Sequence, residues 1–402
     1  MNQPDRTAEV IKRIKELPPL PLSVQKLLQV INDQSKAAND IARVLETDQA
    51  LAGKVLKLVN SAFYGFTRQI STITHAVVIL GNTAIRHLAM GFGAMDSLES
   101  SEGYLNKLTF WRNALACATS GHVMSTKLGG VNREEAFIAG MLHDIGQLVL
   151  DITFPGEYEQ VLNEHSKTLC DREMAAFGIT HELAGELLLE SWQLPPKLVQ
   201  VTKHHHAYKA SMHADPLART IVLADPLASM QTRMFLDRYP QLDWWQLALS
   251  CGLDLNVCTE VQQMISNNLM NAMNFLDVDP DELGDEQLPP GSKGTTTIVA
   301  MTMDKLKWLT ASLNLYGYAT DRATPSAIID DELPDNDLVV VDFNVVNARP
   351  EIVDILATRA YPTAIFYAEN QGEPILPPAL ADLPLIWPIF EPGEIEDAIR
   401  TV

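Results

Sequence analysis

The sequence predicts a two-domain protein, with an all-α domain followed by a small α/β domain. Apolar residues recur with helical spacing through residues 1–276. Residues 277–294 interrupt this pattern with acidic residues, a Pro-Pro pair and glycines, as an interdomain linker does. Over residues 295–402, short apolar runs typical of strands alternate with helical segments. A chain of 402 residues is also too long for one ordinary domain.

Helical periodicity defines the elements of residues 1–276. A first amphipathic helix is predicted from apolar residues spaced i, i+3, i+4 and i+7, namely Val24, Leu27, Leu28 and Ile31. Asp40 is expected to cap a short helix through Leu45, and Asp48 a longer one. Further helices are predicted over residues 111–128, 134–150, 183–192, 198–205 and 218–229. Residues 134–150 are apolar on most sides, so we expect that helix to be central and buried.

Strand signals define residues 295–402. Strands are predicted over residues 296–302, 337–343, 363–367 and 385–389, and helices over residues 306–315, 352–356 and 395–399. Alternation of strands with helices predicts a parallel sheet with crossover helices, because parallel strands need long connections.

Charge and composition exclude several classes of function. The net charge is −21, of which −16 falls in residues 277–402, so the last third is a separate acidic module. Nucleic acid is a poor partner for such a chain, because binding depends on Lys and Arg neutralising phosphates. No uninterrupted apolar run reaches the ~18 residues of a membrane span, and the N-terminus lacks a signal pattern. Cys117, Cys170, Cys251 and Cys258 have no CxxC spacing, which indicates thiols in a reducing cytoplasm.

Residues 39–61 allow one alternative, a DNA-binding helix-turn-helix. Its second helix offers only Lys54 and Lys57 as cations, and most of its other residues are apolar or small. A pair of core helices is therefore the better interpretation.

Several sequence blocks, in this order, resemble an HDOD domain, a helical output module of bacterial signalling proteins related to HD-type phosphohydrolases. The blocks are LPPLP at 17–21, NSAFYG at 60–65, AFIAGMLHDIG at 136–146, WQLP at 192–195 and the His205-His206 pair. The resemblance covers roughly residues 12–230. It implies an HD-like domain over residues 1–276, with residues 231–276 as a helical extension.

Histidine and aspartate residues are dense in the same region. His143, Asp144, His181, His205, His206 and Asp225 combine imidazole and carboxylate groups, which suit Zn, Fe, Mn or Ni. The alternative is that these side chains satisfy one another by hydrogen bonds in a helical core. In HD hydrolases such a site lowers the pKa of a bound water and orients a phosphate. Counting from the WQLP block leaves His204 on the exposed side.

Departures from the hydrolase pattern argue against catalysis. Asn113 stands at the position of the first histidine ligand, and a carboxamide is a poor ligand for these metals. The HD-GYP subgroup carries a lysine where this chain has Gln147, and residues 207–210 replace its Gly-Tyr-Pro segment. A cyclic-dinucleotide phosphodiesterase is therefore disfavoured, and any bound metal is expected to be structural or vestigial.

The strand and helix order of residues 295–402 resembles a flavodoxin-like response-regulator receiver domain. Asp342 follows the third strand expected by that resemblance, at the phosphoacceptor position. The first strand ends Ala300-Met301-Thr302 without the acidic pair that would hold Mg²⁺, and Trp387-Pro388 replaces the Lys-Pro pair. Asp342 is therefore expected to be inactive, in a pseudo-receiver used for docking or dimerisation.

Taken together, the sequence favours a cytoplasmic, non-catalytic bacterial signal-transduction protein that acts through protein–protein interaction of its HDOD domain. Its expected partners are other signalling proteins, with no nucleic acid and no membrane, and a homodimer is one option for its assembly. The alternative from another class is a metal-dependent HD-type phosphohydrolase acting on a nucleotide or phosphodiester. The upstream signal, the partner and the metal are left open.

Overall fold

The computed structural model divides the chain into two compact units. The first comprises residues 1–228, 236–238 and 264–283, and the second residues 229–235, 239–263 and 284–402. The structure describes residues 3–31, 38–61, 64–99, 101–164, 168–207, 215–232, 241–273, 293–316, 318–330, 333, 338–358, 362–368, 376–386 and 388.

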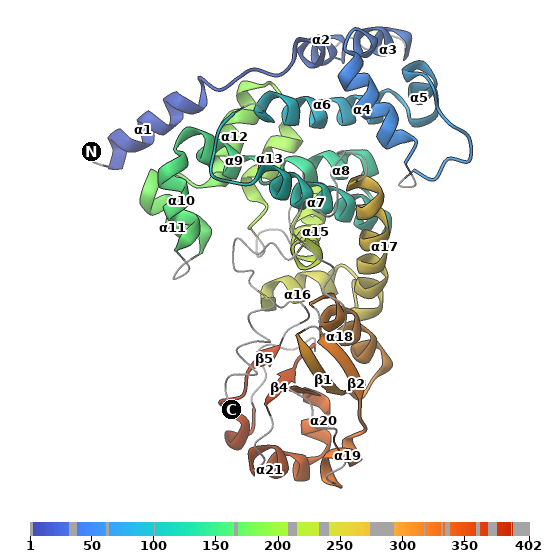
Figure 1. Ribbon diagram of the computed structural model, residues 1–402, viewed down its shortest axis with the longest axis vertical. Helices are drawn as coiled ribbons and strands as arrows, with labels where there is room; N and C mark the ends of the chain where they lie inside the picture. The colour runs from blue at the N-terminus through green and yellow to red at the C-terminus, as the bar shows by residue number, and fades with distance from the viewer. Residues whose placement is uncertain are drawn as a thin grey trace. The chain divides into compact units, whose positions relative to one another are not determined.

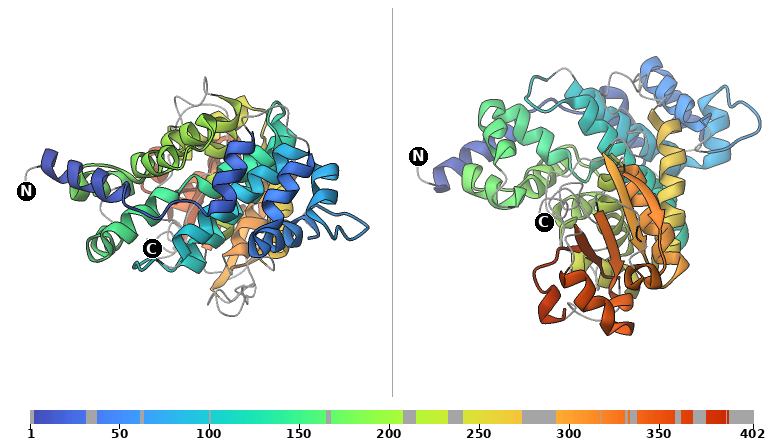
Figure 2. Two further views of the ribbon diagram at one scale, coloured as in Figure 1. Left: turned by 90° about the horizontal axis from the view of Figure 1, so that it is seen from above. Right: turned by 60° about the horizontal axis from the view of Figure 1, so that its bottom comes forward.

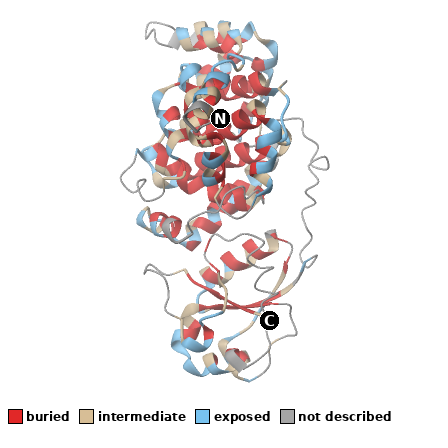
Figure 3. Ribbon diagram, turned by 90° about the vertical axis from the view of Figure 1, so that its left-hand side faces the viewer, coloured by how far each residue is buried: buried red, intermediate tan, exposed pale blue. Residues whose placement is uncertain are grey.

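Helices build the first unit (Figure 1). They are α1 (Gln3–Ile14), α2 (Leu22–Ile31), α3 (Ala38–Glu46), α4 (Gln49–Val59), α5 (Ile73–Leu80), α6 (Asn82–Glu99), α7 (Lys107–Leu128), α8 (Arg133–Leu142), α9 (Ile145–Thr153), α10 (Pro155–Asn163), α11 (Leu169–Phe177), α12 (His181–Ser191), α13 (Pro196–His204) and most of α15 (Pro216–Thr232). Helix α8 packs on α6 and α7, and α9 packs on α12, which also contacts α13. The faces that meet are buried (Figure 3).

A break at His143 and Asp144 divides the central helix. The prediction of one helix over residues 134–150 is wrong there, because α8 ends at Leu142 and α9 begins at Ile145. His143 Nδ1 hydrogen-bonds the Gly140 carbonyl at 2.7 Å. In a continuous helix that carbonyl would accept from the backbone N–H of Asp144. The side chain of His143 therefore takes over a backbone contact at the point where the helix turns.

The same segment is apolar enough to be tested as a membrane span. Within the described parts of the chain, residues 133–153 pass that test by length and composition, and 89% of the apolar window is buried inside the protein. A buried core helix passes the same test, so the segment is explained by its packing on α6, α7 and α12.

Asp48 caps α4 as predicted. One carboxylate oxygen accepts the backbone N–H of Leu51 at 3.0 Å, and the other accepts the Ser23 hydroxyl at 2.8 Å, which joins α2 to α4. Asp40 is not a cap, because α3 begins two residues before it and Asp40 lies in the first turn. There its carboxylate still faces the positive end of the helix dipole. Lys54 forms an ion pair with Asp96 of α6, so one of the two lysines of the considered helix-turn-helix is engaged within the fold.

Helix α1 docks on segments that follow it by some 150 residues. Arg6 forms an ion pair with Glu157, and its guanidinium lies 4.3 Å from the centre of the Phe154 ring. The Thr7 hydroxyl donates to the carbonyl of Gly178 at 3.4 Å, and Val10 is fully buried. The helix contacts α9, α11 and α12.

Helix α12 ends in a turn with a left-handed residue, a conformation that glycine usually occupies. Gln193 has a φ of 56°, and the backbone N–H of Leu194 donates to the Leu189 carbonyl at 3.1 Å, as in a Schellman motif. A residue with a Cβ in this left-handed region costs roughly 1 kcal/mol relative to glycine. Gln193 therefore occupies this turn at a conformational cost.

The second unit contains a five-stranded parallel sheet with order β2-β1-β3-β4-β5 (Figure 2). Its elements in chain order are β1 (Gly294–Val299), α18 (Met303–Leu315), β2 (Tyr318–Arg322), α19 (Pro325–Ile329), β3 (Leu338–Asp342), α20 (Phe343–Ala348), α21 (Pro350–Thr358), β4 (Thr363–Phe366), η2 (Pro378–Leu380) and β5 (Leu385–Ile386). Val299 pairs with Val341, and Asp342 with Phe366. The parallel sheet confirms the predicted α/β character of this region.

Two details differ from, or go beyond, the expected elements. Strand β2 was not predicted, because its sequence YATDR is polar beyond its first two residues and it lies at the edge of the sheet. Predicted helix 395–399 and Trp387 lie outside the described residues.

The boundary between the two domains stays a prediction. Residues 239–263, which contain α16 (Gln241–Ser250) and the first part of α17 (Leu255–Met273), group with the second compact unit, and the rest of α17 groups with the first. The sequence assigned them to the extension of the helical domain. Nearly all of the predicted linker, residues 277–294, lies outside the described residues.

Limited proteolysis tests whether the domain boundary lies within residues 277–294, as the sequence predicts, or before residues 239–263. We expect a protease of broad specificity to cut within residues 277–294, because the acidic, Pro- and Gly-containing segment offers no periodic apolar face to bury. Mass spectrometry would locate the cut, and circular dichroism would show that both fragments melt cooperatively. A chain resistant in that window, or a C-terminal fragment that unfolds once residues 239–263 are removed from it, would contradict separable domains.

Candidate metal centre

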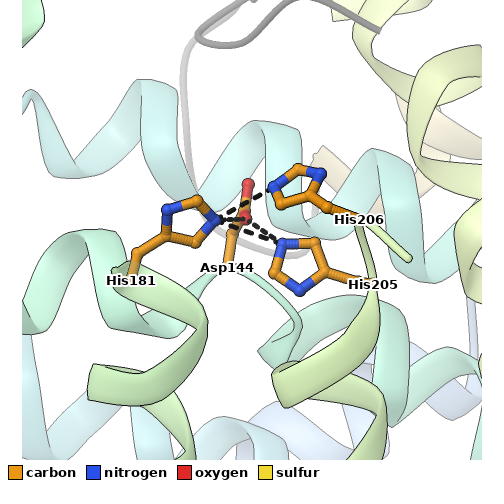
Figure 4. A group of neighbouring side chains, drawn as sticks. All are labelled: Asp144, His181, His205 and His206. Atoms are coloured by element: carbon orange, nitrogen blue, oxygen red, sulfur yellow. Dashed lines mark hydrogen bonds and ion pairs between the residues drawn. The ribbon is translucent and has the colours of Figure 1, made fainter. Parts of the chain in front are cut away.

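Four segments bring the predicted histidines and aspartates together. The turn between α8 and α9 supplies His143 and Asp144, and α12 begins with His181. His205 and His206 follow the end of α13, and α15 carries Asp225. Figure 4 shows Asp144 among the three imidazoles of His181, His205 and His206.

One group of ligand atoms converges around Asp144 Oδ1. His205 Nε2 lies 3.0 Å from this oxygen, and His181 Nε2 lies 3.6 Å from it. His181 Nε2 is also 3.3 Å from His205 Nε2 and 3.0 Å from His206 Nε2. The ligand atoms of these four residues all lie within 4.8 Å of one another. One ion could therefore contact all four side chains.

Hydrogen bonds on the far side of the rings determine which nitrogen faces this group. His181 Nδ1 lies 2.7 Å from Glu173 Oε2, and His205 Nδ1 lies 2.7 Å from the Thr202 carbonyl. A carbonyl or carboxylate oxygen accepts a hydrogen bond, so each Nδ1 donates and each Nε2 is left to bind a metal ion or a second proton. Two neutral rings would place lone pairs 3.3 Å apart, and a proton or a metal ion between them removes that repulsion. This second contact of each ring is the usual arrangement around metal-bound histidines.

A second group lies on the other oxygen of Asp144. His143 Nε2 is 3.4 Å from Asp144 Oδ2 and 3.2 Å from Asp225 Oδ1. His143 Nδ1 donates to the Gly140 carbonyl, so its Nε2 faces the two carboxylates, with a proton that they accept or with a lone pair for a shared metal ion. Cys117 of α7 completes this group within 4.8 Å. Asp144 therefore bridges two clusters, and all six predicted residues belong to one of them.

Sequence reasoning missed two members of the site. Cys117 was interpreted as an incidental thiol, although it follows Asn113 by one helical turn and so shares its face of α7, which was the available signal. Glu173 is fully buried and accepts the backbone N–H of His181 at 2.7 Å and the Tyr158 hydroxyl at 2.8 Å. No sequence pattern singled out Glu173.

The electrostatics of the cluster favour a bound positive charge. Burial lowers the pKa of His143, but the carboxylates of Asp144 and Asp225 outweigh it and hold this pKa well above its usual value. Burial is likewise outweighed at His181, where Glu173 raises the pKa to about 9. Burial and the neighbouring His205 and His181 keep the pKa of His206 well below its usual value. A proton or a metal ion is needed to neutralise the buried carboxylates, and the donor set fits a divalent transition metal.

The site is enclosed. His143, His181 and His205 are fully buried, and Asp225 and Asp144 are 2% and 8% exposed. His206 is half-buried, and His204 is exposed. Asn113 and Gln147, the two departures from the hydrolase pattern, are buried on α7 and α9. Of residues 207–210, only Ala207 is described.

Two glycines allow the helices around the turn to approach closely. A Cβ atom on Gly146 would lie 1.8 Å from the backbone oxygen of His181, and one on Gly140 would lie 2.7 Å from the backbone of Cys117 and Ala118. The first contact brings α9 against α12, and the second brings α8 against α7. Ligand-bearing segments therefore meet through backbone contacts on both sides of His143 and Asp144.

Asp342 lies at the end of β3 in a different environment. It is fully buried, accepts the backbone N–H groups of Met301 and Asn344 at 3.1 Å each, and accepts Lys305 Nζ at 2.8 Å. Lys305 belongs to α18 and is itself 6% exposed. The sequence reasoning identified the missing acidic pair but not this lysine.

Comparison with known proteins identifies the first unit. Residues 17–208 match the family model of the HDOD domain. The chain contains an HDOD domain. An uncharacterised protein of Treponema pallidum is 26% identical over 247 residues, which are 57% of this chain and 44% of the relative, so this chain spans less than half of that relative.

Solved structures of HDOD-like proteins share the fold. A candidate phosphohydrolase of Shewanella amazonensis is 25% identical, with a TM-score of 0.55 over 67% of this chain and 98% of that one. An HDOD domain protein of unknown function from Geobacter sulfurreducens is 25% identical, with a TM-score of 0.54 over 70% of this chain and 98% of that one. A candidate metal-dependent phosphohydrolase of Shewanella amazonensis, 16% identical with a TM-score of 0.50 over 66% and 99% of the two chains, shows the fold alone.

The substitution Gly146→Ala tests the backbone contact at the site. We expect it to lower the free energy of unfolding by roughly 1–3 kcal/mol, because the added methyl group overlaps the carbonyl of His181. The matched control is Gly53→Ala on α4, where a Cβ meets nothing within 4 Å. That control should be neutral or stabilise the protein by up to ~1 kcal/mol through helix propensity. Urea unfolding followed by circular dichroism measures both, and equal effects would contradict the close approach.

Proposed function

We propose that the protein is a non-catalytic bacterial signal-transduction protein of the cytoplasm, which acts through protein–protein interaction of its HDOD domain. The enclosure of the ligand set carries this proposal. Five of its six side chains are at most 8% exposed, whereas a hydrolase must bring a phosphate of its substrate to the metal. Asn113 supports it, since the position of the first histidine ligand holds a carboxamide.

A metal in this site would have a structural role. His181, His205 and His206 through Nε2, together with Asp144 through Oδ1, are the residues that would hold it. When bound in an open site, such an ion lowers the pKa of a water molecule and polarises a phosphate. Here Glu173 and the Thr202 carbonyl orient two of the rings, and the cluster joins α12, α13 and the turn before α9. The same residues therefore stabilise the packing of these helices around a positive charge.

A metal-dependent phosphohydrolase acting on a nucleotide or phosphodiester is the second candidate. The convergence of the histidine Nε2 atoms favours it, and so does the incomplete burial of His206. The similarity to a candidate phosphohydrolase, at 25% identity over 98% of that chain, supports the same class.

The substitutions His143→Ala and Asp144→Ala test the structural role. Both are expected to lower the melting temperature, and Asp144→Ala should cost roughly 3–5 kcal/mol, because it leaves buried imidazoles without their counter-charge. His204→Ala is the matched control, since His204 is exposed beside the site and should change stability little. Equal stability of all three variants would show that the cluster does not hold the fold together.

Assays on the wild type decide between the two functions. Protein supplied with Mn²⁺, Fe²⁺ or Ni²⁺ would be given cyclic dinucleotides, nucleotides and a chromogenic phosphodiester, with the bound metal measured by elemental analysis. We expect no metal-dependent turnover. Turnover that Asp144→Ala abolishes and His204→Ala preserves would establish the phosphohydrolase instead.

For the C-terminal unit we propose a pseudo-receiver used for docking or homodimerisation. The strand order β2-β1-β3-β4-β5 is that of flavodoxin-like sheets, which place their sites beyond the carboxyl ends of the strands where the order reverses. Asp342 lies at this edge, but the ammonium group of Lys305 and two backbone N–H groups already compensate its charge. This arrangement supports a site that takes up neither Mg²⁺ nor a phosphoryl group.

Incubation with acetyl phosphate and Mg²⁺ tests the pseudo-receiver. We expect no phosphorylated adduct by intact-mass spectrometry, because Asp342 lacks acidic neighbours to hold Mg²⁺ and is bound to Lys305. The Asp342→Asn variant is the control for modification elsewhere. An adduct present in the wild type and absent from Asp342→Asn would refute the proposal.

A further inference from the structure

A cavity of about 520 Å³ lies in the HDOD unit, lined by none of the histidines or aspartates described above. The LPPLP and WQLP blocks line it together with α2 and α6. Leu20, Leu28 and Trp192 give it an apolar wall. Trp192 is fixed there by its indole N–H, which donates to the carbonyl of Pro18 at 3.1 Å. The volume is in the range of small-molecule sites, which combine such walls with few polar groups.

Arg86 of α6 is the charged residue that lines this cavity. Its Nε atom is buried and has no hydrogen-bond partner among the described residues. Burial lowers the pKa of the guanidinium, which the carboxylate of Glu135 opposes. A buried Nε–H without an acceptor is costly, and an anion in the cavity would supply that acceptor.

Three glutamines, Gln25, Gln29 and Gln193, add polar groups to the lining. Gln193 lines the cavity from the left-handed turn after α12, where glycine would be unstrained. Strain of this kind is concentrated at functional sites, so a side chain in this conformation on the cavity wall points to a role in the cavity. Gln25 of α2 is oriented by its Nε2, which donates to the Leu20 carbonyl at 2.7 Å.

We propose that this cavity binds a small organic anion, with its carboxylate or phosphate group on Arg86 and its apolar part against Trp192. A planar guanidinium matches both oxyanions in bidentate geometry, and the glutamine amides can bind further polar atoms of the ligand. The site is independent of the metal centre and of the interaction proposed for the HDOD domain.

Titration calorimetry on the full-length protein tests this site with benzoate and phenyl phosphate as probes and benzamide as the neutral analogue. We expect saturable 1:1 binding of at least one anion and weaker binding of benzamide. The stronger of the two anions identifies whether a carboxylate or a phosphate is preferred. Failure of both anions to bind, or equal binding of benzamide, would overturn the proposal.

Variants locate the binding. Arg86→Gln should raise the dissociation constant of the anion by at least about tenfold, as expected for a lost charge-assisted hydrogen bond. Arg43→Gln, on the exposed surface of α3, removes the same charge and should leave affinity unchanged. Gln193→Gly relieves the strained turn, so the variant protein should unfold at the same or a higher temperature than the wild type. Its affinity for the anion should nevertheless be lower, because it lacks the Gln193 side chain. Unchanged affinity in Arg86→Gln, or an equal loss in Arg43→Gln, would show that the anion binds elsewhere.

Discussion

Two helix crossings without intervening side chains hold the turn that carries His143 and Asp144. Gly146 lies against the backbone of His181, and Gly140 lies against the backbone of Cys117 and Ala118. Because the backbones are in direct contact, there is no room for even one added methyl group between each helix and the turn. For this reason His181 reaches Oδ1 of Asp144, and Cys117 reaches the group formed by His143 and Asp225. Glu173 orients the ring of His181, and the Thr202 carbonyl orients the ring of His205. These orientations direct the Nε2 atoms toward Asp144 only while the two crossings hold the helices in place.

Both units bury an aspartate at the end of a secondary-structure element, and they compensate its charge in different ways. Asp342 accepts the ammonium group of Lys305, a counter-charge that the same unit supplies. Asp144 is surrounded by imidazoles, whose charge depends on a proton or a metal ion. We therefore expect the charge balance at Asp144 to depend on a proton or metal ion from solution, whereas the charge balance at Asp342 is supplied by Lys305 within its own unit. This contrast explains how two aspartates from catalytic-looking motifs can both serve the fold.

Local signals in the sequence predicted much of this structure. Apolar periodicity located about half of the helices of residues 1–276, missing α1, α5, α6, α10 and α11 among others. Asp48 was a correct cap, and the alternation of strands and helices predicted the parallel sheet. The histidine and aspartate motifs predicted which residues would gather, because each block has its own spacing. What the sequence could not predict depends on tertiary contacts. The break at His143 arises from a side chain bonding to Gly140, and Lys305 and Glu173 reach their partners across helices or strands.

The docking of α1 has a consequence for the order in which the chain folds. Arg6 and Glu157 are 151 residues apart, and Thr7 and Gly178 are 171 apart. At a synthesis rate of ~5–20 residues per second, these partners leave the ribosome on the order of ten seconds after α1. Until then Val10 and Ile14, which are buried in the finished fold, have no surface of their own domain to cover them. Helix α1 is thus synthesised well before the segments on which it docks, and a nascent-chain chaperone has that interval in which to bind it.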